Sequence, residues 1–186
     1  VSPPTIPLPP LGPAPSDKMV YVATYAGVSI SQDGGLTWVT TTEGQNGFSS
    51  EHETRSIHAD GSTVVAGTIG GISISHDNGA TWTTTTEGQN GFGGNRVYEV
   101  RVKGYSIYAA TGKGFSISQD GGLTWTTTVA EQNGFGLSTT TAGVLLDSGK
   151  IYSATYSGVS ISNDNGASWT STSPGQNGLA NSYIFF

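Results

Sequence analysis

Four short phrases along the chain place an Asp directly before a Gly or an Asn, with a Trp a few residues later. An Asp in a tight turn can accept backbone N–H hydrogen bonds while a following Gly adopts a positive φ. Asp-x-Asn patterns also occur in calcium-binding loops, so Asp77-Asn78 and Asp164-Asn165 invite that interpretation. Calcium needs more oxygen ligands than the phrase supplies. The pattern therefore favours a structural turn, and we expect no metal and no cofactor.

Other chemistry has less support in the sequence. The chain has no Cys, which excludes thiolate catalysis, disulfides and Cys-based metal sites. Its three His residues, His52, His58 and His76, do not lie in the context of a nucleophile elbow. A formal charge of -6 with only seven Lys and Arg residues leaves no basic stripe for nucleic acid. The longest aliphatic run, 144–146, is too short to predict a membrane-spanning helix.

The phrases with Asp and Trp are parts of a longer repeat. Their Trp residues lie 44, 43 and 44 residues apart, and a Gln-Asn-Gly begins seven residues after each of them. Between the phrases, apolar and polar residues alternate as in half-buried strands, and no helical period appears. One repeat predicts four strands at 97–102, 106–110, 115–118 and 124–128, separated by turns that contain Gly.

A unit of four strands that recurs at this interval is typical of β-propeller blades. We predict an all-β fold, a small propeller of four four-stranded blades over 17–186, preceded by a Pro-rich extended arm at 1–16. The chain enters the repeat at a second strand, 19–24, and leaves it on a first strand, 182–186. These two segments are expected to pair and complete one blade, either within one chain or by strand swapping between chains.

The repeated phrase Ser-x-Asp-x-Gly-x-Thr-Trp resembles the Asp-box, or BNR repeat, of sialidase-like and sortilin-like propellers and of bacterial surface proteins. The resemblance covers the chain after the Pro-rich arm. It implies a turn motif between the third and fourth strands of each blade, rather than a metal site or a catalytic centre. The residues to which it assigns this structural role, with the Trp rings in the core, are Asp33, Trp38, Asp77, Trp82, Asp120, Trp125, Asp164 and Trp169.

Two sets of loops are expected to share the propeller face opposite the Asp-boxes. On that face Tyr25 and Tyr156 could stack on a sugar, while amides of the Gln-Asn-Gly loops bond to its hydroxyls. The alternative is structural, because Asn-Gly is a common turn that needs a positive φ. The Gln side chains could instead bond neighbouring blades together. The amide candidates are Gln45, Asn46, Gln89, Asn90, Gln132, Asn133, Gln176 and Asn177.

The repeats disagree mainly in the segments 49–60, 96–103 and 137–146. Scaffold positions should repeat, whereas residues of a single binding site need not, so these segments could hold a site. Drift on a solvated surface would produce the same pattern.

The resemblance to sialidases raises the question of a glycosidase. Such a site needs three Arg for the substrate carboxylate, and this chain has only Arg55, Arg96 and Arg101. Arg96 and Arg101 are expected on one strand with side chains on opposite faces, because they lie five residues apart. Sialidases also need six blades and an Arg-Ile-Pro motif, which this sequence lacks. We therefore expect a protein that is not an enzyme.

Two functions fit these features. One is a recognition module for carbohydrate or protein, at the cell surface or outside it after bacterial export, as the low charged fraction of 11% also suggests. The other is a structural subunit, joined to copies of itself into a fibre or ring by the arm and the terminal strand. The residues expected to serve assembly are Ile6, Leu8, Leu11, Tyr183, Ile184, Phe185 and Phe186.

Overall fold

The computed structural model describes residues 18–51, 53–180 and 184. Every regular element in these residues is a strand or a single 3-10 turn. The strands, in chain order, are β1 (Val20–Thr24), β2 (Gly27–Ser31), β3 (Val39–Thr42), β4 (Thr54–Asp60), β5 (Thr63–Thr68), β6 (Gly71–Ser75), β7 (Thr83–Thr85), β8 (Val97–Lys103), β9 (Ser106–Thr111), β10 (Gly114–Ser118), β11 (Thr126–Thr128), β12 (Thr141–Asp147), β13 (Lys150–Thr155), β14 (Gly158–Ser162) and β15 (Thr170–Thr172). The 3-10 turns are η1 (Gln45–Gly47), η2 (Gln89–Gly91) and η3 (Gln132–Gly134).

The strands form four antiparallel sheets, in which neighbours along the chain pair by hydrogen bonds. We call them blade 1 (β1 to β3), blade 2 (β4 to β7), blade 3 (β8 to β11) and blade 4 (β12 to β15). Blades 2 to 4 have the four strands that the sequence predicts, whereas blade 1 has three described strands. The expected pairing of 182–186 with β1 lies outside the described residues, apart from Ile184, which is not in a strand. The N-terminal arm with Ile6, Leu8 and Leu11 also lies outside them.

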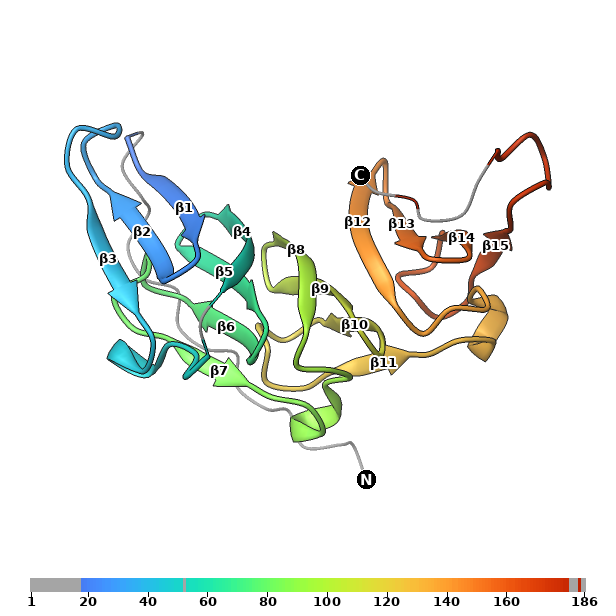
Figure 1. The fold of residues 1–186 in the computed structure, drawn as a ribbon, viewed down its shortest axis with the longest axis horizontal. Coiled ribbons are helices and arrows are strands. Elements are labelled where there is room, and N and C mark those ends of the chain that lie inside the picture. Colours follow the sequence, from blue (N-terminus) through green and yellow to red (C-terminus); the bar gives the residue numbers. More distant parts are fainter. Residues whose placement is uncertain (1–17, 52, 181–183, 185–186) are drawn as a thin grey trace, which may run out of the picture.

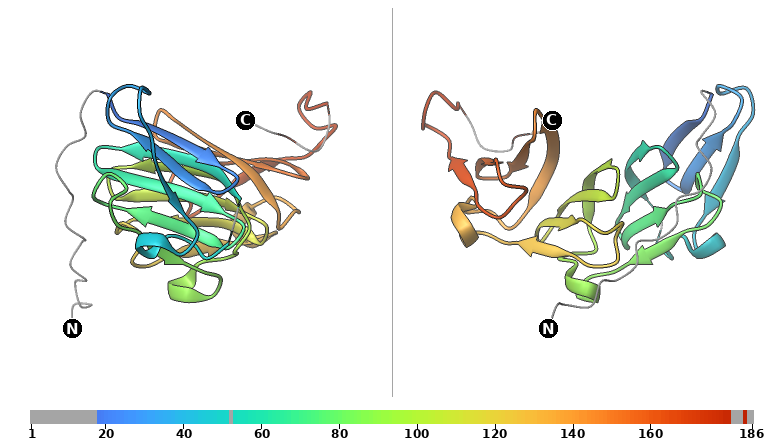
Figure 2. Two further views of the ribbon diagram at one scale, coloured as in Figure 1. Left: turned by 60° about the vertical axis from the view of Figure 1, so that its left-hand side comes forward. Right: turned by 180° about the vertical axis from the view of Figure 1, so that it is seen from behind.

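The four blades follow one another along a U-shaped arc (Figure 1). The first strands β4, β8 and β12 line the inside of the arc, and the last strands β7 and β11 run along its outside. Blade 1 and blade 4 stand at the two ends of the arc, as the view from behind also shows (Figure 2, right). The chain is thus an all-β, four-blade β-propeller, as the repeats predict.

Each Asp-box closes the hairpin between the third and fourth strands of its blade through its own side chains. In blade 3 the Asp120 carboxylate accepts hydrogen bonds from the Thr124 N–H at 2.9 Å and the Thr124 hydroxyl at 2.5 Å. The Ser118 hydroxyl donates to the same carboxylate at 2.8 Å and accepts from the Gly122 N–H at 2.8 Å. Gly122 has a φ of 94°, a conformation that residues with a Cβ rarely adopt. All four hairpins repeat the pattern around Asp33, Asp77, Asp120 and Asp164.

The hydrogen bonds also stabilise the ionised form of these carboxyl groups. Donation from the Thr37 side chain and backbone lowers the pKa of Asp33 to about 2, and donation from Ser168 does the same for Asp164. At Asp77 and Asp120 partial burial opposes ionisation, but the bonds from the following Thr still lower the pKa. The carboxylates are therefore charged acceptors across the neutral pH range.

Consecutive blades dock through an apolar contact that repeats at three junctions. Between blades 2 and 3, a Cβ placed on Gly122 would lie 2.2 Å from Ile74 Cδ1, so the Ile packs directly on the glycine backbone. The Phe92 ring meets the Trp125 ring edge-on, with centroids 4.9 Å apart. Trp82, Trp125 and Trp169 are each only 6% exposed as a result. These rings form the core between the blades, where aromatic burial contributes most.

A polar contact accompanies the apolar one. The Trp125 N–H donates to the Asn90 carbonyl at 2.8 Å, and the Thr127 hydroxyl donates to the Gly91 carbonyl at 2.8 Å. The outgoing Gln-Asn-Gly loop of one blade is thus bonded to the outer strand of the next. The same Trp to Asn bonds, each of 2.8 Å, join Trp82 to Asn46 and Trp169 to Asn133.

Trp38 differs from the core position that the sequence predicts. It is 43% exposed, although its indole N–H still donates to the Gly35 carbonyl at 3.1 Å within the hairpin. The reason is its place in the arc: the other three Trp rings are covered by the preceding blade, and within the described residues no blade precedes blade 1.

Candidate ligand-binding face

The turns between second and third strands meet the connections between blades at one face of the arc. The Gly112 N–H, in the turn after β9, donates to the Arg96 carbonyl at 2.9 Å, just before β8. The Tyr156 N–H, in the turn after β13, donates to the Thr140 carbonyl at 3.4 Å, just before β12. We call this surface the loop face. The segments just before β8 and β12 therefore lie beside these turns. The Gln-Asn-Gly part of each connection differs from the expected placement, because Asn46 lines a cleft with Asp77 of the next hairpin and its carbonyl accepts the Trp82 N–H.

A pocket of about 390 Å³ opens on the loop face where blades 2 and 3 meet. Blade 2 contributes Ile69 and Glu87, and blade 3 contributes Tyr98 and Lys113. The connecting segment Gly94 to Arg96 and Thr140 complete the wall. Repeat-specific residues therefore line this pocket, because Arg96 and Tyr98 lie in one of the segments where the repeats disagree.

Two cationic side chains, Arg96 and Lys113, and one carboxylate, Glu87, line this pocket in a chain whose net charge is -6. Arg55 stacks over the Tyr98 ring, with its guanidinium carbon 5.2 Å from the ring centroid, and its Nε also bonds to Glu53 at 2.9 Å. Lys113 pairs with Glu87 at 2.5 Å on the pocket wall. Arg96 is exposed, and the described residues record no carboxylate partner for its guanidinium. An incoming anion would therefore find an available bidentate donor beside an aromatic ring.

The three Arg residues do not converge on one point. Arg101 pairs with Glu99 and lines a different pocket with His58 and Leu146. The sequence predicts Arg96 and Arg101 on one strand, and this is wrong. Arg96 precedes β8, which begins at Val97, whereas Arg101 lies within it. Burial lowers the pKa of His58, which favours a neutral imidazole at that second pocket.

The Gln side chains have a local role rather than the bridging role that was one interpretation of the sequence. Gln89 Oε1 accepts the N–H of Thr86 at 2.9 Å, which closes its own loop. The backbone oxygens of the neighbouring Asn residues join the blades instead. Each Asn adopts a left-handed φ of 50° or 51°. The loops that share this arrangement hold Gln45, Asn46, Gln132, Asn133, Gln176 and Asn177.

Tyr25 and Tyr156 both lie in turns of the loop face, and they are 75% and 36% exposed. Tyr25 follows β1 in blade 1, and Tyr156 follows β13 in blade 4. They stand at opposite ends of the arc (Figure 1). One chain in this arrangement does not bring the two rings to one ligand.

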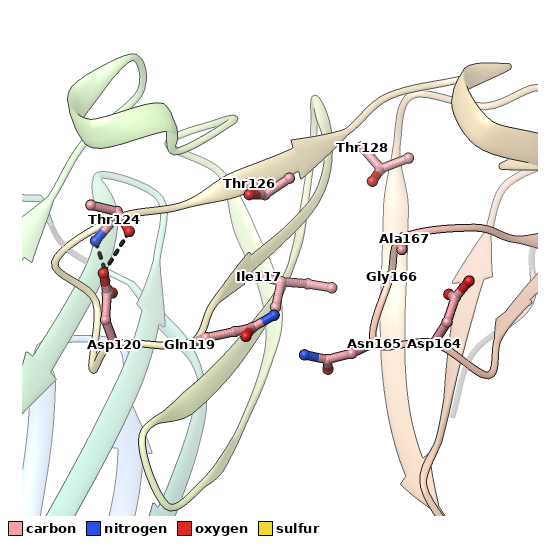
Figure 3. A pocket seen from close by; sticks show the side chains of 10 residues that line it. All are labelled: Ile117, Gln119, Asp120, Thr124, Thr126, Thr128, Asp164, Asn165, Gly166 and Ala167. Carbon is pink, nitrogen blue, oxygen red and sulfur yellow. Dashed lines mark hydrogen bonds between the residues drawn. The ribbon is translucent and has the colours of Figure 1, made fainter. Parts of the chain in front are cut away.

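Two further clefts lie near the Asp-boxes, on the other side of the blades. The cleft between blades 3 and 4 has a volume of about 420 Å³, and its counterpart between blades 1 and 2 about 450 Å³. Figure 3 shows Gln119 and Asn165 reaching toward each other from two neighbouring hairpins. Between blades 2 and 3, His76 fills the equivalent place and its Nε2 lies 3.0 Å from the Gly121 carbonyl. These clefts offer amide groups that could bond to hydroxyls or to a peptide backbone.

No group of three or more His, Asp or Glu that could hold a metal occurs among the residues that the structure describes. In the pair Asp164-Asn165, which the calcium interpretation would use, the Asp164 carboxylate accepts hydrogen bonds from Ser168 and Ser162 within its hairpin. Asn165 accepts a hydrogen bond from the Tyr108 hydroxyl at 3.1 Å. The Asp164 oxygens therefore stabilise the hairpin, and the Asn165 side-chain oxygen joins blade 4 to blade 3. Within the same described residues, no helix has the length and apolar character needed to cross a membrane.

No family model matches the sequence, and no curated protein matches it. Solved structures of β-propeller proteins do match the fold. YCF48 bound to D1 peptide is 16% identical, with a TM-score of 0.63, over 90% of this chain and 57% of that chain. The extracellular domain of the hybrid two component system BT3049 from B. thetaiotaomicron is 19% identical, with a TM-score of 0.68, over 84% of this chain and 22% of that chain. An ancestral GH74 enzyme is 18% identical, with a TM-score of 0.63, over 88% of this chain and 25% of that chain.

These likenesses define the class of protein: the chain is a β-propeller module. It spans little more than half of the length of the YCF48 chain and a quarter or less of the other two. At this level of identity the similarity extends to the fold alone, and none of these comparisons shows the Asp-box family, whose resemblance is carried only by the repeated phrase.

Proposed function

We propose that the chain is a non-enzymatic, extracellular recognition module, and that the pocket between blades 2 and 3 binds a protein segment through a carboxylate. The observation that carries this proposal is the position of Arg96. Its guanidinium stands exposed beside Tyr98 and Lys113, in a segment that the other repeats do not share. A carboxylate is the partner that a guanidinium fork binds best.

The size of the site fits a short segment of extended chain. A pocket of about 390 Å³ accommodates one or two side chains rather than a folded partner. The Gly94 to Arg96 connection and the turn at Gly112 provide backbone groups beside it. A similar propeller, YCF48, has been solved with a peptide bound, and another similar structure is an extracellular domain, which supports a protein ligand outside the cell.

Carbohydrate is the second candidate, supported by the two amide-lined clefts rather than by the pocket. Gln119 and Asn165 lie together with several Thr hydroxyls in a cleft that repeats along the arc. Such groups suit sugar hydroxyls, but no aromatic ring for stacking lines either cleft among the described residues. The protein ligand is therefore preferred.

The experiment screens the full chain against two arrays, one of ten-residue peptides with and without Asp or Glu and one of neutral glycans. Peptides with carboxylates are expected to bind, and their best representative is then titrated by calorimetry. Arg96→Gln should weaken that binding at least about tenfold, because it removes one partner of a desolvated charge pair.

Arg101→Gln is the matched control, because Arg101 lies outside the pocket and pairs with Glu99. It should leave the affinity within about twofold of the unmodified chain, given that sites outside an interface contribute little. Binding to neutral glycans alone, or equal losses in both variants, would contradict a carboxylate site at Arg96.

A further inference from the structure

The two ends of the arc carry complementary faces. The face of blade 1 that points away from blade 2 presents Trp38, Gly35 and Thr40. These residues are equivalent to Trp125, Gly122 and Thr127, which dock on blade 2. Trp38 is 43% exposed where Trp125 is 6% exposed. A Cβ on Gly35 would meet only the Trp38 ring at 3.6 Å, whereas one on Gly122 would overlap Ile74.

Blade 4 presents the opposite half of the same contact. Ile161 is equivalent to Ile30, Ile74 and Ile117, which are 9%, 4% and 7% exposed, yet Ile161 itself is only half-buried. The three docked Ile residues cover the glycine of the next hairpin. Ile161 lies on the last described blade and has no following hairpin to cover.

The outgoing loop of blade 4 already has the docked conformation. Asn177 has a φ of 50°, as Asn133 does in a docked loop. The Leu179 N–H donates to the Gln176 carbonyl at 2.9 Å, and the Ser173 N–H donates to Gln176 Oε1 at 3.1 Å. The carbonyls that elsewhere accept from a Trp N–H and a Thr hydroxyl are thus held in place. Leu179 stands where Phe48, Phe92 and Phe135 pack on a Trp ring.

The sequence of the hairpins matches this docking. Residues 31–38 and 118–125 are identical, so blade 1 carries the same Asp-box as blade 3. Blades 2 and 4 share the other variant, Asp-Asn-Gly-Ala, at 77–80 and 164–167. A junction from blade 4 to blade 1 would therefore repeat the alternation and resemble the junction from blade 2 to blade 3.

From these faces we infer that two copies of this chain join end to end and close an eight-blade ring. Blade 4 of each copy docks on blade 1 of the other, so both joints use the same pair of faces and the assembly closes with two-fold symmetry. A second copy is the occupant because blades 1 and 4 of one chain lie apart at the two ends of the U-shaped arc (Figure 1). The two faces are complementary, so a second arc that faces the first would fill both positions.

The joint also creates a site that one chain lacks. Ile69 and Gly112, from the turns of blades 2 and 3, line one pocket of the loop face. Their equivalents at the joint are Tyr156 and the partner's Tyr25. The ring therefore places the two exposed tyrosines at one composite position, where a single arc keeps them at opposite ends.

The test is the mass of the full chain in solution, measured by light scattering over a range of concentrations. We expect twice the 19.1 kDa of one chain, falling to one chain on dilution. Ile161→Glu places a charge on the blade 4 face, and Trp38→Ala removes the ring from the blade 1 face. Each variant alone should be a monomer at concentrations where the unmodified chain is a dimer.

Mixing the two variants gives a sharper result, because each retains the face that the other has lost. The mixture should form a dimer with a single joint, at a higher concentration than the unmodified ring because the second joint is missing. Leu137→Glu, at a 67% exposed position away from both faces, is the matched control and should remain a dimer.

A monomer at every concentration, a mass that grows beyond two copies, or a dimer that survives both single variants overturns the ring. Circular dichroism establishes that each variant is folded. If Ile161→Glu does not fold, Asn177→Pro replaces it as the variant of the blade 4 face, because it disturbs the outgoing loop of blade 4. Trp38→Ala remains the variant of the blade 1 face. These masses are measured without ligand, so a failure of peptide binding leaves the result unchanged.

Discussion

Trp125 and Trp38 occupy identical hairpins in different surroundings. Both indole N–H groups donate to a glycine carbonyl three residues earlier, at 3.1 Å in each case. Trp125 is nevertheless almost fully buried, whereas Trp38 is 43% exposed. The comparison separates two levels of organisation: the hairpin is a local structure fixed by the phrase itself, and burial of its Trp depends on the blade before it.

The largest difference is expected when each ring is removed. Trp125→Ala should destabilise the chain by about 3 to 5 kcal/mol, because it deletes a buried ring and leaves a cavity between blades 2 and 3. Trp38→Ala should cost less than about 1 kcal/mol, since much of that ring is already in water. Urea unfolding, followed by circular dichroism at a concentration where the chain is a monomer, measures both values.

Trp125→Phe serves as a control that retains an aromatic ring, and it provides a folded protein if Trp125→Ala does not fold. Equal losses at Trp38 and Trp125 under monomeric conditions would contradict the difference in burial on which the comparison rests.

The glycines beneath the two rings give a second, smaller contrast. Gly35 and Gly122 have φ values of 95° and 94°, so an Ala at either position is strained to a similar extent. Only at Gly122 would the new methyl group also overlap the Ile74 side chain. Gly122→Ala should therefore cost about 1 to 3 kcal/mol more than Gly35→Ala in the same unfolding measurement. A difference near zero would show that Ile74 can move aside without loss.

Much of this fold is predictable from local patterns. The repeat spacing predicts the blades, and the strands of blade 3 begin and end within two residues of the expected positions, as at β8 and β11. This succeeds because alternation and turn chemistry act over a few residues.

The ends of the arc were not predictable in the same way. The seven residues before Trp38 are identical to those before Trp125, so the hairpin sequence does not separate an exposed ring from a buried one. The candidate pocket was predictable only in part. The segments 49–60 and 96–103, where the repeats disagree, were candidates for a site, but the stacking of Arg55 on Tyr98 needs two strands from different blades. Gln89 illustrates a further limit, because its amide closes its own loop by a bond that no turn preference predicts.

Acid should weaken the hairpins of Trp38 and Trp125 to a similar extent, because the hydrogen bonds of each Asp carboxylate lie within its own hairpin. Hydrogen bonds from Thr37 lower the pKa of Asp33 to about 2, and those from Thr124 lower the pKa of Asp120. As the pH falls, the unfolded chain binds protons near the ordinary Asp pKa of about 3.9, at a higher pH than the folded chain does. The contribution of these carboxylates to the free energy of unfolding is therefore fully present above that value and is lost as the pH drops toward 2. Urea midpoints at pH 5 and pH 2.5 measure the loss.

Asp33→Asn and Asp120→Asn should each reduce this pH dependence by a similar amount, since neither carboxylate relies on a neighbouring blade for its hydrogen bonds. The effect for one hairpin is expected to be smaller than the packing effects, because these carboxylates are partly exposed and solvent screens them. A reduction at Asp120 alone would indicate that docking, and not the hairpin, stabilises the charged form.

The smallest contrast concerns one hydroxyl group. Thr127 and Thr40 each lie 2.8 Å from a Ser hydroxyl of their own blade, at Ser116 and Ser29. Thr127 also donates to the Gly91 carbonyl of the preceding loop at 2.8 Å, whereas the described residues place no such loop beside Thr40. Thr127→Val should therefore cost about 1 kcal/mol more than Thr40→Val in the monomer, the usual net value of one hydrogen bond. In the ring of two copies Thr40 gains the partner's Gly178 carbonyl, so the difference between the two variants should shrink when unfolding is measured at concentrations that favour the dimer. If the difference does not change with concentration, Thr40 gains no hydrogen bond when two copies associate. That result would contradict the docking of blade 4 on blade 1.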